Sequence, residues 1–524
     1  MLMEALPLAF APLNLFAAVI GLIAGIIFGA IPGLSATLAI ALFVPVTFLL
    51  DPTHGITMLG GIYAGAIFGG SITAILINIP GTPASIVTAF EGHAMAKRGD
   101  APYALGLAAL SSGVGGFLSA IAMLFLAPVL GQLALSLGPA EFVGLVIFSL
   151  VVVVVMVPQA ISRNALSCVI GLFLATIGFD PVQGTSRFTF GFSQISSGFN
   201  VVAVLIGFFC MTQALVLARD AIQGREAPAV TFGQGSAFGR ILQALTRFPA
   251  KFLRASSLGT VLGIMPAIGP ESTPFLAHAM EKRFSRNKDQ FGKGSEEGLI
   301  ASEASISANV GGSLIPLLSL GIPGSGAAAM FIGALTLHGL RPGPLLFVEH
   351  GPVIYAFLIA FAVTNLIMII FGIFGARYFA VVLKLPKGFT ATLVMFFSVF
   401  GAYAVNNSMF DVWVMIGATV FALLLGRAGI PLLPLILGML LGPLLEENLS
   451  AAIIGLRDLS GLMGRPIALI FGAMSCITLA VSLYQRAQSG SSEPTLFNEP
   501  TVPASQATTQ RKSTSKPDTL QGRT

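Results

Sequence analysis

The sequence is poor in charged residues. Only 9% of its 524 residues are Asp, Glu, Lys or Arg, whereas 55% are hydrophobic. A soluble domain typically carries about 25% charged residues, so this composition excludes a soluble globular protein. The formal net charge of +5 is small for a chain of this length, and it gives no indication of nucleic-acid binding. The composition predicts a polytopic protein that is surrounded by a lipid bilayer.

Residues that hold metals or perform catalysis are also scarce. The chain has three cysteines and five histidines. Cys168, Cys210 and Cys476 stand alone in apolar segments, and no two histidines have the spacing of metal ligands. No Ser/His/Asp arrangement and no ATP-binding loop is found in the sequence. We therefore expect no catalytic residues, no cofactor and no metal beyond a coupling Na⁺, so that the protein is not an enzyme.

Long apolar segments recur from residue 8 to residue 484, as in Ala104 to Pro128 and Val353 to Phe374. Each is close to the roughly 20 residues that cross a hydrocarbon core. The first, Leu6 to Ala30, lacks a basic start and a small-residue cleavage site, so we expect a membrane helix there rather than a signal peptide. The expected fold class is all-α. It is a polytopic integral membrane protein of about ten to twelve membrane elements, with two internal structural repeats that contain broken or re-entrant helices.

Polar segments divide the chain. Residues 219–254 are rich in Lys and Arg, and the positive-inside rule places such a linker in the cytoplasm. After Gln485 the composition changes to Ser, Thr, Gln, Pro and Lys, which predicts a disordered, cytoplasmic C-terminal tail. We therefore expect a first transmembrane repeat (1–218), a polar basic linker (219–254), a second transmembrane repeat (255–486) and a disordered polar tail (487–524).

Two segments interrupt hydrophobic runs with the same Pro-Gly core. Residues 78–84 read Asn-Ile-Pro-Gly-Thr-Pro-Ala, and residues 321–327 read Gly-Ile-Pro-Gly-Ser-Gly-Ala. A second pair precedes them, at residues 25–33 and 259–267, which end in Ala-Ile-Pro-Gly and Ile-Met-Pro-Ala. A broken backbone at membrane depth is tolerated where it lines a polar cavity. Two breaks in each half, in the same order, predict an internally duplicated transporter.

The breaks also predict a binding chemistry. A helix that ends at Pro-Gly leaves free carbonyl groups that can hold a cation, and a helix that begins there presents N–H groups that can hold an anion. Side-chain oxygens beside the breaks are hard ligands suited to Na⁺. The candidate substrate-binding residues are Pro32, Gly33, Ser35, Asn78, Pro80, Gly81, Thr82, Ser85, Pro323, Gly324, Ser325 and Gly326. The candidate cation-binding residues are Ser71, Thr73, Asn78, Glu303, Asn309 and Ser313.

Alternatives accompany these candidates. Small residues also let membrane helices pack closely without binding anything, although packing alone does not require a matched pair of breaks. Glu303 either couples an ion or positions a helix, or it faces solvent at the edge of a loop. Glu271, which follows Pro266, is either a structural charge at a helix N-terminus or a functional group.

At these motifs the chain closely resembles the large membrane subunit of the tripartite tricarboxylate transporters, bacterial uptake systems that use a periplasmic binding protein. The matching stretches are residues 25–45, 63–99, 184–191, 291–347 and 401–448. The resemblance implies secondary active uptake of a small carboxylate with a cation, Na⁺ or H⁺. It implies a periplasmic solute-binding protein and a small four-helix membrane subunit as partners, and a multi-pass location in the bacterial inner membrane. The substrate and ion region would lie around Asn78 to Ser85 and Gly321 to Gly326.

The chain departs from the family pattern near the second break. It has Pro266-Ala267 where the family usually has Pro-Gly, and Ile306-Ser307 close behind Glu303 where the family commonly has Asn-Asn. Two amide side chains, and with them oxygen ligands and hydrogen-bond donors, are therefore missing. For this reason an uncoupled channel or a non-transporting membrane scaffold with the same fold is the alternative to a symporter. The sequence leaves open which carboxylate is carried, whether Na⁺ or H⁺ is coupled, and whether the motion is of the rocking or the elevator type.

Overall fold

The computed structural model describes residues 2–157, 159–180, 184–223, 238–266, 268–379, 385–456 and 465–488. The chain divides into two units, 1–478 and 479–524, and residues 479–488 are the described part of the second. Residues 224–237 of the predicted linker, Ala267 and residues 489–524 of the predicted tail lie outside the described residues.

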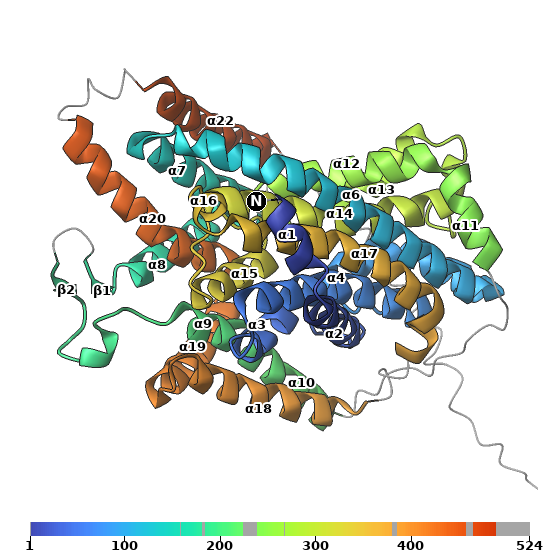
Figure 1. Cartoon of the computed structure of the whole chain (residues 1–524), viewed down its shortest axis with the longest axis horizontal. Helices are drawn as coiled ribbons and strands as arrows, with labels where there is room; N and C mark the ends of the chain where they lie inside the picture. The colour runs from blue at the N-terminus through green and yellow to red at the C-terminus, as the bar shows by residue number, and fades with distance from the viewer. Residues whose placement is uncertain are drawn as a thin grey trace, which may run out of the picture. The chain divides into compact units, whose positions relative to one another are not determined.

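Almost all of the described elements are helices (Figure 1). Before the linker they are α1 (Leu2–Ala9), α2 (Pro12–Gly29), α3 (Ala36–Thr47), α4 (Pro52–Ile77), η1 (Pro83–Ser85), α5 (Ile86–Thr88), η2 (Ala89–His93), η3 (Ala96–Asp100), α6 (Ala101–Leu135), α7 (Pro139–Met156), α8 (Ile161–Ala175), η4 (Ser193–Ile195), α9 (Val201–Leu205), η5 (Ile206–Met211) and α10 (Thr212–Ile222). After it come α11 (Phe238–Arg247), α12 (Pro249–Ile264), α13 (Thr273–Phe284), η6 (Lys288–Gln290), α14 (Glu296–Leu320), α15 (Gly326–Leu337), α16 (Leu346–Glu349), α17 (Gly351–Phe379), α18 (Lys387–Asn406), α19 (Met409–Arg427), α20 (Leu432–Leu456) and α22 (Pro466–Gln488).

Ten helical segments of the described chain are long and apolar enough to cross a membrane, and α3, α8 and α15 are shorter apolar helices. The prediction of an all-α polytopic membrane protein is confirmed. A small exception is a hairpin of two short strands, β1 (Gly178–Phe179) and β2 (Ser186–Arg187), which pair antiparallel with Gly178 opposite Arg187.

The two Pro-Gly breaks have the same local geometry. Helix α4 ends at Asn78 with φ 57° and helix α14 ends at Gly321 with φ 73°, both in the left-handed region. Asn and Gly are the residues that most readily adopt this conformation at a helix C-terminus. Pro80 and Pro323 follow two residues later, and because proline lacks an N–H group the helix cannot resume there. A new helical segment then begins in each half, η1–α5 and α15.

The two halves also share a close contact between a glycine of the Pro-Gly break and a preceding helix. Helix α2 lies against α4, and α12 lies against α14. A Cβ added at Gly81 would lie 2.2 Å from the Gly29 carbonyl oxygen, and one added at Gly324 would lie 2.7 Å from that of Gly263. Only glycine permits such an approach. Gly81 therefore lies against the last turn of α2, and Gly324 lies against the last turn of α12. The same contact in both halves supports the predicted repeats.

The segment predicted as the linker is partly helical. Helix α10 continues to Ile222, and α11 with the start of α12 covers residues 238–254 apart from Phe248. The boundary predicted at 254/255 therefore falls inside α12.

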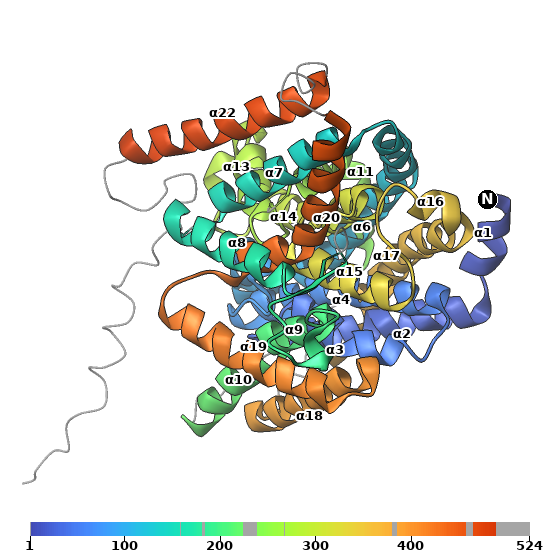
Figure 2. The ribbon, with the colours of Figure 1, turned by 90° about the vertical axis from the view of Figure 1, so that its left-hand side faces the viewer.

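Helices α4 and α14 form the interior of the first unit. Residues 298–319 of α14 are all buried, on every side of the helix, as is expected of a helix surrounded by other helices. Its neighbours are α6, α12, α13 and α4, and Figure 1 shows α6 and α17 beside this central pair. Helices α7, α8 and α20 lie together in a separate group (Figure 2).

Candidate functional site

The Glu303 carboxylate is the centre of a buried hydroxyl cluster. Ser71 donates a hydrogen bond of 2.6 Å to Oε1, and Thr88 donates another to the same oxygen. Ser112 donates a hydrogen bond of 2.6 Å to Oε2. The Glu303 side chain is only 1% exposed, and none of the ion pairs among the described residues includes it. This carboxylate is therefore held by neutral donors alone.

The cluster joins the two halves of the chain. Glu303 lies on α14, whereas Ser71, Thr88 and Ser112 lie on α4, α5 and α6. Thr88 reaches the carboxylate because the chain turns back after the break at residues 78–82. The prediction of Ser71 and Glu303 as one site is consistent with their contact, and the alternative of a solvent-facing Glu303 at a loop edge is wrong, since the residue is buried within a helix.

A second set of contacts lies at the other break. The Tyr63 hydroxyl on α4 is 3.0 Å from Ser325 Oγ and 3.4 Å from Ser313 Oγ. Ser325 is also the N-cap of α15, where its side chain accepts a hydrogen bond from the Ala328 N–H group. Such a cap fixes the first turn of the helix and its free N–H groups. Ser313 and Ser325, predicted from opposite sides of the break, are thus brought together by a residue of the first half.

The N-terminus of α15 meets the N-terminus of α3. A Cβ added at Gly326 would lie 3.4 Å from Thr37 Oγ1, and the two helices are in contact. Ser35 caps α3 by accepting a hydrogen bond from the Leu38 N–H group. The first turns of these two helices, each of which carries a partial positive charge, therefore lie beside each other. That arrangement favours an anion.

Three buried side-chain oxygens near the breaks have no hydrogen-bond partner among the described residues: Thr82 Oγ1, Ser307 Oγ and Asn309 Oδ1. Asn309 donates through its amide nitrogen to the Ile268 carbonyl oxygen and to Thr273 Oγ1, which leaves its oxygen available. Buried polar atoms are rarely left unpaired. Oxygens of this kind are able to accept a proton donor or ligate a cation.

The remaining predicted residues serve mainly the backbone of the breaks. Thr73 and Ser85 donate to the carbonyl oxygens of Gly70 and Thr82. Asn78 is exposed, and its left-handed conformation ends α4. Pro32, Gly33, Pro80, Gly81, Pro323 and Gly324 form the turns. Asn309 lies six residues beyond Glu303 on α14, a separation that turns it to a different face of the helix, so the predicted cation ligands do not form a single group.

Three contributors are not among the candidate site residues, although Thr88 is one of the hydroxyl residues that follow the first break in the sequence. Thr88, Ser112 and Tyr63 each join the two halves. Ser112 lies next to Ser111 inside a long apolar helix, and a pair of hydroxyls in such a helix is a signal that could have identified it. Among the described residues no group of three His, Cys, Asp or Glu side chains could hold a metal ion.

Glu271 is the carboxylate close to the second break. A Cβ added at Gly269 would lie 2.3 Å from Glu271 Oε2 and 3.3 Å from the Ser325 Cβ. This carboxylate and the cap of α15 therefore lie on the same side of Gly269, which has no side chain to come between them. The two interpretations from the sequence, a structural charge or a functional group, are both compatible with this position.

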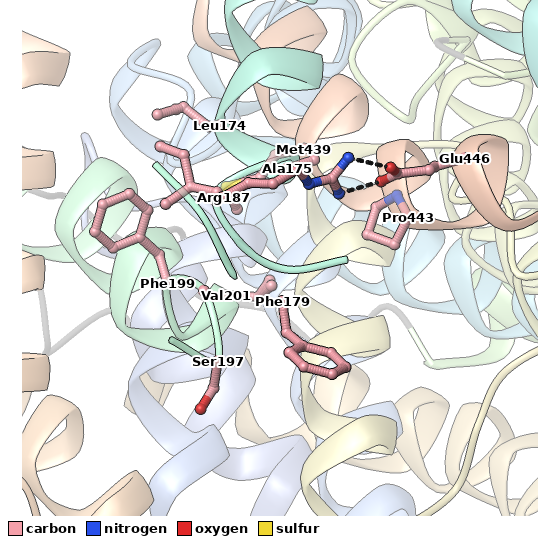
Figure 3. A pocket seen from close by; sticks show the side chains of 12 residues that line it. Leu174, Ala175, Phe179, Arg187, Ser197, Phe199, Val201, Met439, Pro443 and Glu446 are labelled. Carbon is pink, nitrogen blue, oxygen red and sulfur yellow. Dashed lines mark hydrogen bonds and ion pairs between the residues drawn. The ribbon is translucent and has the colours of Figure 1, made fainter. Parts of the chain in front are cut away.

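A separate pocket of about 320 Å³ lies between the β1–β2 hairpin, α8, α9 and α20 (Figure 3). Arg187 of the hairpin donates two hydrogen bonds, of 2.5 and 3.0 Å, to the Glu446 carboxylate of α20. The hydrogen bond to Glu446 raises the pKa of Arg187 above its ordinary value. None of the predicted site residues lines this pocket, and the bidentate pair ties the hairpin to α20.

Comparison with known proteins agrees with these features. The profile of the family described as "Tripartite tricarboxylate transporter TctA family" matches residues 15–437. The "Uncharacterized 52.8 kDa protein in TAR-I ttuC' 3'region" of Agrobacterium vitis is 33% identical over 476 residues, 90% of this chain and 94% of that protein. The "Uncharacterized protein in TAR-II ttuC' 3'region" of the same organism is 33% identical over 226 residues, 43% of this chain and 93% of that protein. No solved structure matches. The chain belongs to the tripartite tricarboxylate transporter TctA family, whose members are membrane transport proteins.

Proposed function

We propose that the chain is the large permease subunit of a receptor-dependent secondary active transporter, which imports a small di- or tricarboxylate together with a cation, Na⁺ or H⁺. The observation that carries this proposal is the buried Glu303 carboxylate, which is held by hydroxyls of the first repeat beside the matched breaks. A buried carboxylate without a positive partner is costly in a membrane protein unless it binds a proton or a cation.

The substrate site is proposed at the meeting point of α3 and α15. Their N-termini are capped by Ser35 and Ser325, and their free N–H groups attract the negative charge of a carboxylate. Tyr63 and Ser313 lie beside the Ser325 cap and add hydroxyl donors. The cation site is proposed at Glu303 with Ser71, Thr88 and Ser112, four side chains that supply only oxygen atoms, the ligand type that Na⁺ and protons share.

Coupling between cation binding and substrate binding is expected because α4 and α14 each contribute residues to both proposed sites. Helix α14 carries Glu303 in its first half and Ser313 near the second break, and α4 carries Ser71 as well as Tyr63. A change in the charge of Glu303 acts on the same two helices that position the substrate groups. Occupation of one site therefore changes the free energy of the conformations that the other site requires.

The partners proposed are a periplasmic solute-binding protein and a small four-helix membrane subunit, as the tripartite family name indicates. The location proposed is the bacterial inner membrane, with residues 219–254 and the C-terminal tail in the cytoplasm. The basic residues of α11 and α12, among them Arg240, Arg247 and Lys251, support this orientation.

The test is uptake of radiolabelled citrate and succinate by proteoliposomes that contain this chain and the small membrane subunit. We expect accumulation when the solute-binding protein is present and a Na⁺ or H⁺ gradient is imposed. Accumulation that continues after the gradient has been collapsed would contradict coupling, and uptake that does not need the solute-binding protein would contradict receptor dependence. Flux without accumulation would favour the channel, and no flux with any carboxylate would favour the scaffold.

A further inference from the structure

A second buried carboxylate, Glu91, lies one helical turn beyond Thr88 in η2. Its side chain is fully buried, and it is bound on both oxygens by groups of the second half. His278 Nε2 lies 2.7 Å from Oε1, and the Gly292 N–H group donates to the same oxygen at 2.6 Å. The N–H groups of Gly294 and Ser295 donate to Oε2 at 2.9 and 2.7 Å.

The segment that receives Glu91 has a conformation suited to a carboxylate. Gly292 and Gly294 have φ values of 82° and 95°, and alternation of this kind turns successive N–H groups toward one point to form an anion-binding nest. A Cβ added at Gly298 would lie 2.7 Å from Glu91 Oε1, so the first turn of α14 also leaves room for the carboxylate. Arg98 holds the other side of this segment through a 2.8 Å hydrogen bond to the Gly294 carbonyl oxygen.

We propose that Glu91 is a positioning residue for translocation: it clamps residues 83–93 of the first repeat to α13 and residues 292–295 of the second, and so holds Thr88 against the Glu303 carboxylate. The segment from η1 to η2 is short and irregular, with a three-residue 3₁₀ turn, three α-helical residues and a π-helical turn. It needs external contacts because so short a helical segment is not stable by itself. Thr88–Glu303 and the Glu91 contacts are two attachments on one side of it, a turn apart.

This inference rests on the proposed function in one respect, namely that Glu303 carries the coupling cation. The clamp predicts that loss of Glu91 changes the cation affinity of the site without removing any of its ligands. Glu91→Gln keeps the shape of the side chain but turns an NH₂ group toward donors that require an acceptor. His278→Ala removes a single partner, and Glu349→Gln, the same chemical change at an exposed glutamate, is the matched control.

The experiment has two measurements. The first is hydrogen exchange of the backbone amides in the purified protein, and the second is the concentration of Na⁺ or H⁺ that gives half-maximal citrate uptake. We expect Glu91→Gln to speed exchange at least tenfold in residues 83–93 and 292–295, with α4 and α14 still protected, and His278→Ala to do the same more weakly. We also expect the half-saturating cation concentration to change about tenfold, upward for Na⁺, which loses the Thr88 oxygen, or downward for H⁺, because the ionised carboxylate loses the Thr88 donor. In a Thr88→Ala background, Glu91→Gln should add little to the change in the half-saturating cation concentration, since interacting residues are non-additive.

Unchanged hydrogen exchange in Glu91→Gln and His278→Ala would overturn the clamp. Additive effects of Glu91→Gln and Thr88→Ala on the half-saturating cation concentration would overturn the proposal that Glu91 acts through Thr88. Faster exchange with an unchanged half-saturating cation concentration would overturn the positioning role. If the wild-type protein transports without any cation dependence, the proposed function fails. In that case, hydrogen exchange of Glu91→Gln and His278→Ala still decides whether Glu91 clamps the two segments together.

Discussion

Ser112 of α6 donates a 2.6 Å hydrogen bond to Glu303 of α14, whereas its neighbour Ser111 donates to the Leu107 carbonyl oxygen of its own helix. Both serines are fully buried. Adjacent, equally buried hydroxyls thus differ in whether they contact the proposed cation site. They form a matched pair for mutation.

Ser112→Ala is predicted to change the half-saturating concentration of the coupling cation about tenfold, because a hydrogen bond to a charged group contributes about 1.5–3 kcal/mol. The concentration should rise if the cation is Na⁺, which loses an oxygen ligand, and fall if it is H⁺, because the ionised carboxylate loses a donor that stabilises it. Initial rates of citrate uptake against Na⁺ concentration and against pH provide the measurement. Ser111→Ala should leave this concentration within about twofold of the wild type. Equal effects of the two substitutions would show that α6 packing, and not contact with Glu303, is what matters.

The glycines of the two breaks predict a graded effect on stability. An added methyl group at Gly81 meets the Gly29 carbonyl oxygen at 2.2 Å, and one at Gly324 meets the Gly263 carbonyl oxygen at 2.7 Å. Overpacking of this kind costs on the order of 1–3 kcal/mol, so Gly81→Ala should lower the thermal unfolding temperature more than Gly324→Ala does. Gly417→Ala on α19, where nothing lies within 4 Å, should raise it slightly, since alanine favours a helix over glycine. A larger decrease in the unfolding temperature for Gly324→Ala than for Gly81→Ala would contradict the order expected from the two contact distances.

Tyr63→Phe tests the proposed substrate site. The substitution removes the hydroxyl that lies 3.0 Å from Ser325 Oγ and keeps the ring. A neutral hydrogen bond contributes about 0.5–1.5 kcal/mol net, so the KM for the carboxylate should rise about two- to tenfold, while the half-saturating cation concentration changes little. Tyr355→Phe on α17 is the control, with no change in KM expected. An equal rise in KM in both variants would show that the Tyr63 hydroxyl has no specific role in substrate binding.

Acid stability should depend on Glu91, which lies between α4 and α6 outside the spanning helices. Burial alone would raise the pKa of Glu91, but the hydrogen bonds from His278 and from the N–H groups of Gly292 and Ser295 lower it below its ordinary value. The folded state then binds fewer protons than the unfolded state. The stability from this group is complete above its unfolded pKa of about 4.3 and is lost as pH falls through the lowered folded pKa.

Glu91→Gln should therefore lose less stability than the wild type on acidification from about pH 5 to about pH 3, because its side chain does not titrate. Thermal unfolding in detergent at a series of pH values measures this difference. Glu349→Gln should follow the wild-type slope. Parallel slopes for wild type and Glu91→Gln would mean that the Glu91 carboxylate does not contribute to acid sensitivity.

Much of the fold could be predicted from the sequence because its signals are local. Apolar length predicted the spanning helices, and the Pro-Gly pairs predicted the ends of α4 and α14, since proline and left-handed residues act within a few positions of the chain. Ser71 and Glu303 were also chosen as candidates, because polar side chains stand out in apolar segments, and the structure brings them into contact.

The rest of the site could not be predicted because it depends on contacts between distant segments. Thr88 and Ser112 reach Glu303 from residues 215 and 191 positions away, and Glu91 is bound by N–H groups more than 200 positions away. No periodicity encodes such pairs. Asn309, a candidate because it precedes the second break, lies on a different face of α14 from Glu303, which the candidate residues alone did not indicate.

The most direct test of the account is gradient-driven uptake by Glu303→Gln in proteoliposomes with the small membrane subunit and the solute-binding protein. Radiolabelled citrate and succinate are the probes, and exchange of internal for external substrate without a gradient is measured in the same vesicles. The account predicts that Glu303→Gln retains exchange but no longer accumulates substrate when a Na⁺ or H⁺ gradient is imposed. Accumulation equal to that of the wild type, with the same cation dependence, would contradict the assignment of Glu303 as the coupling residue.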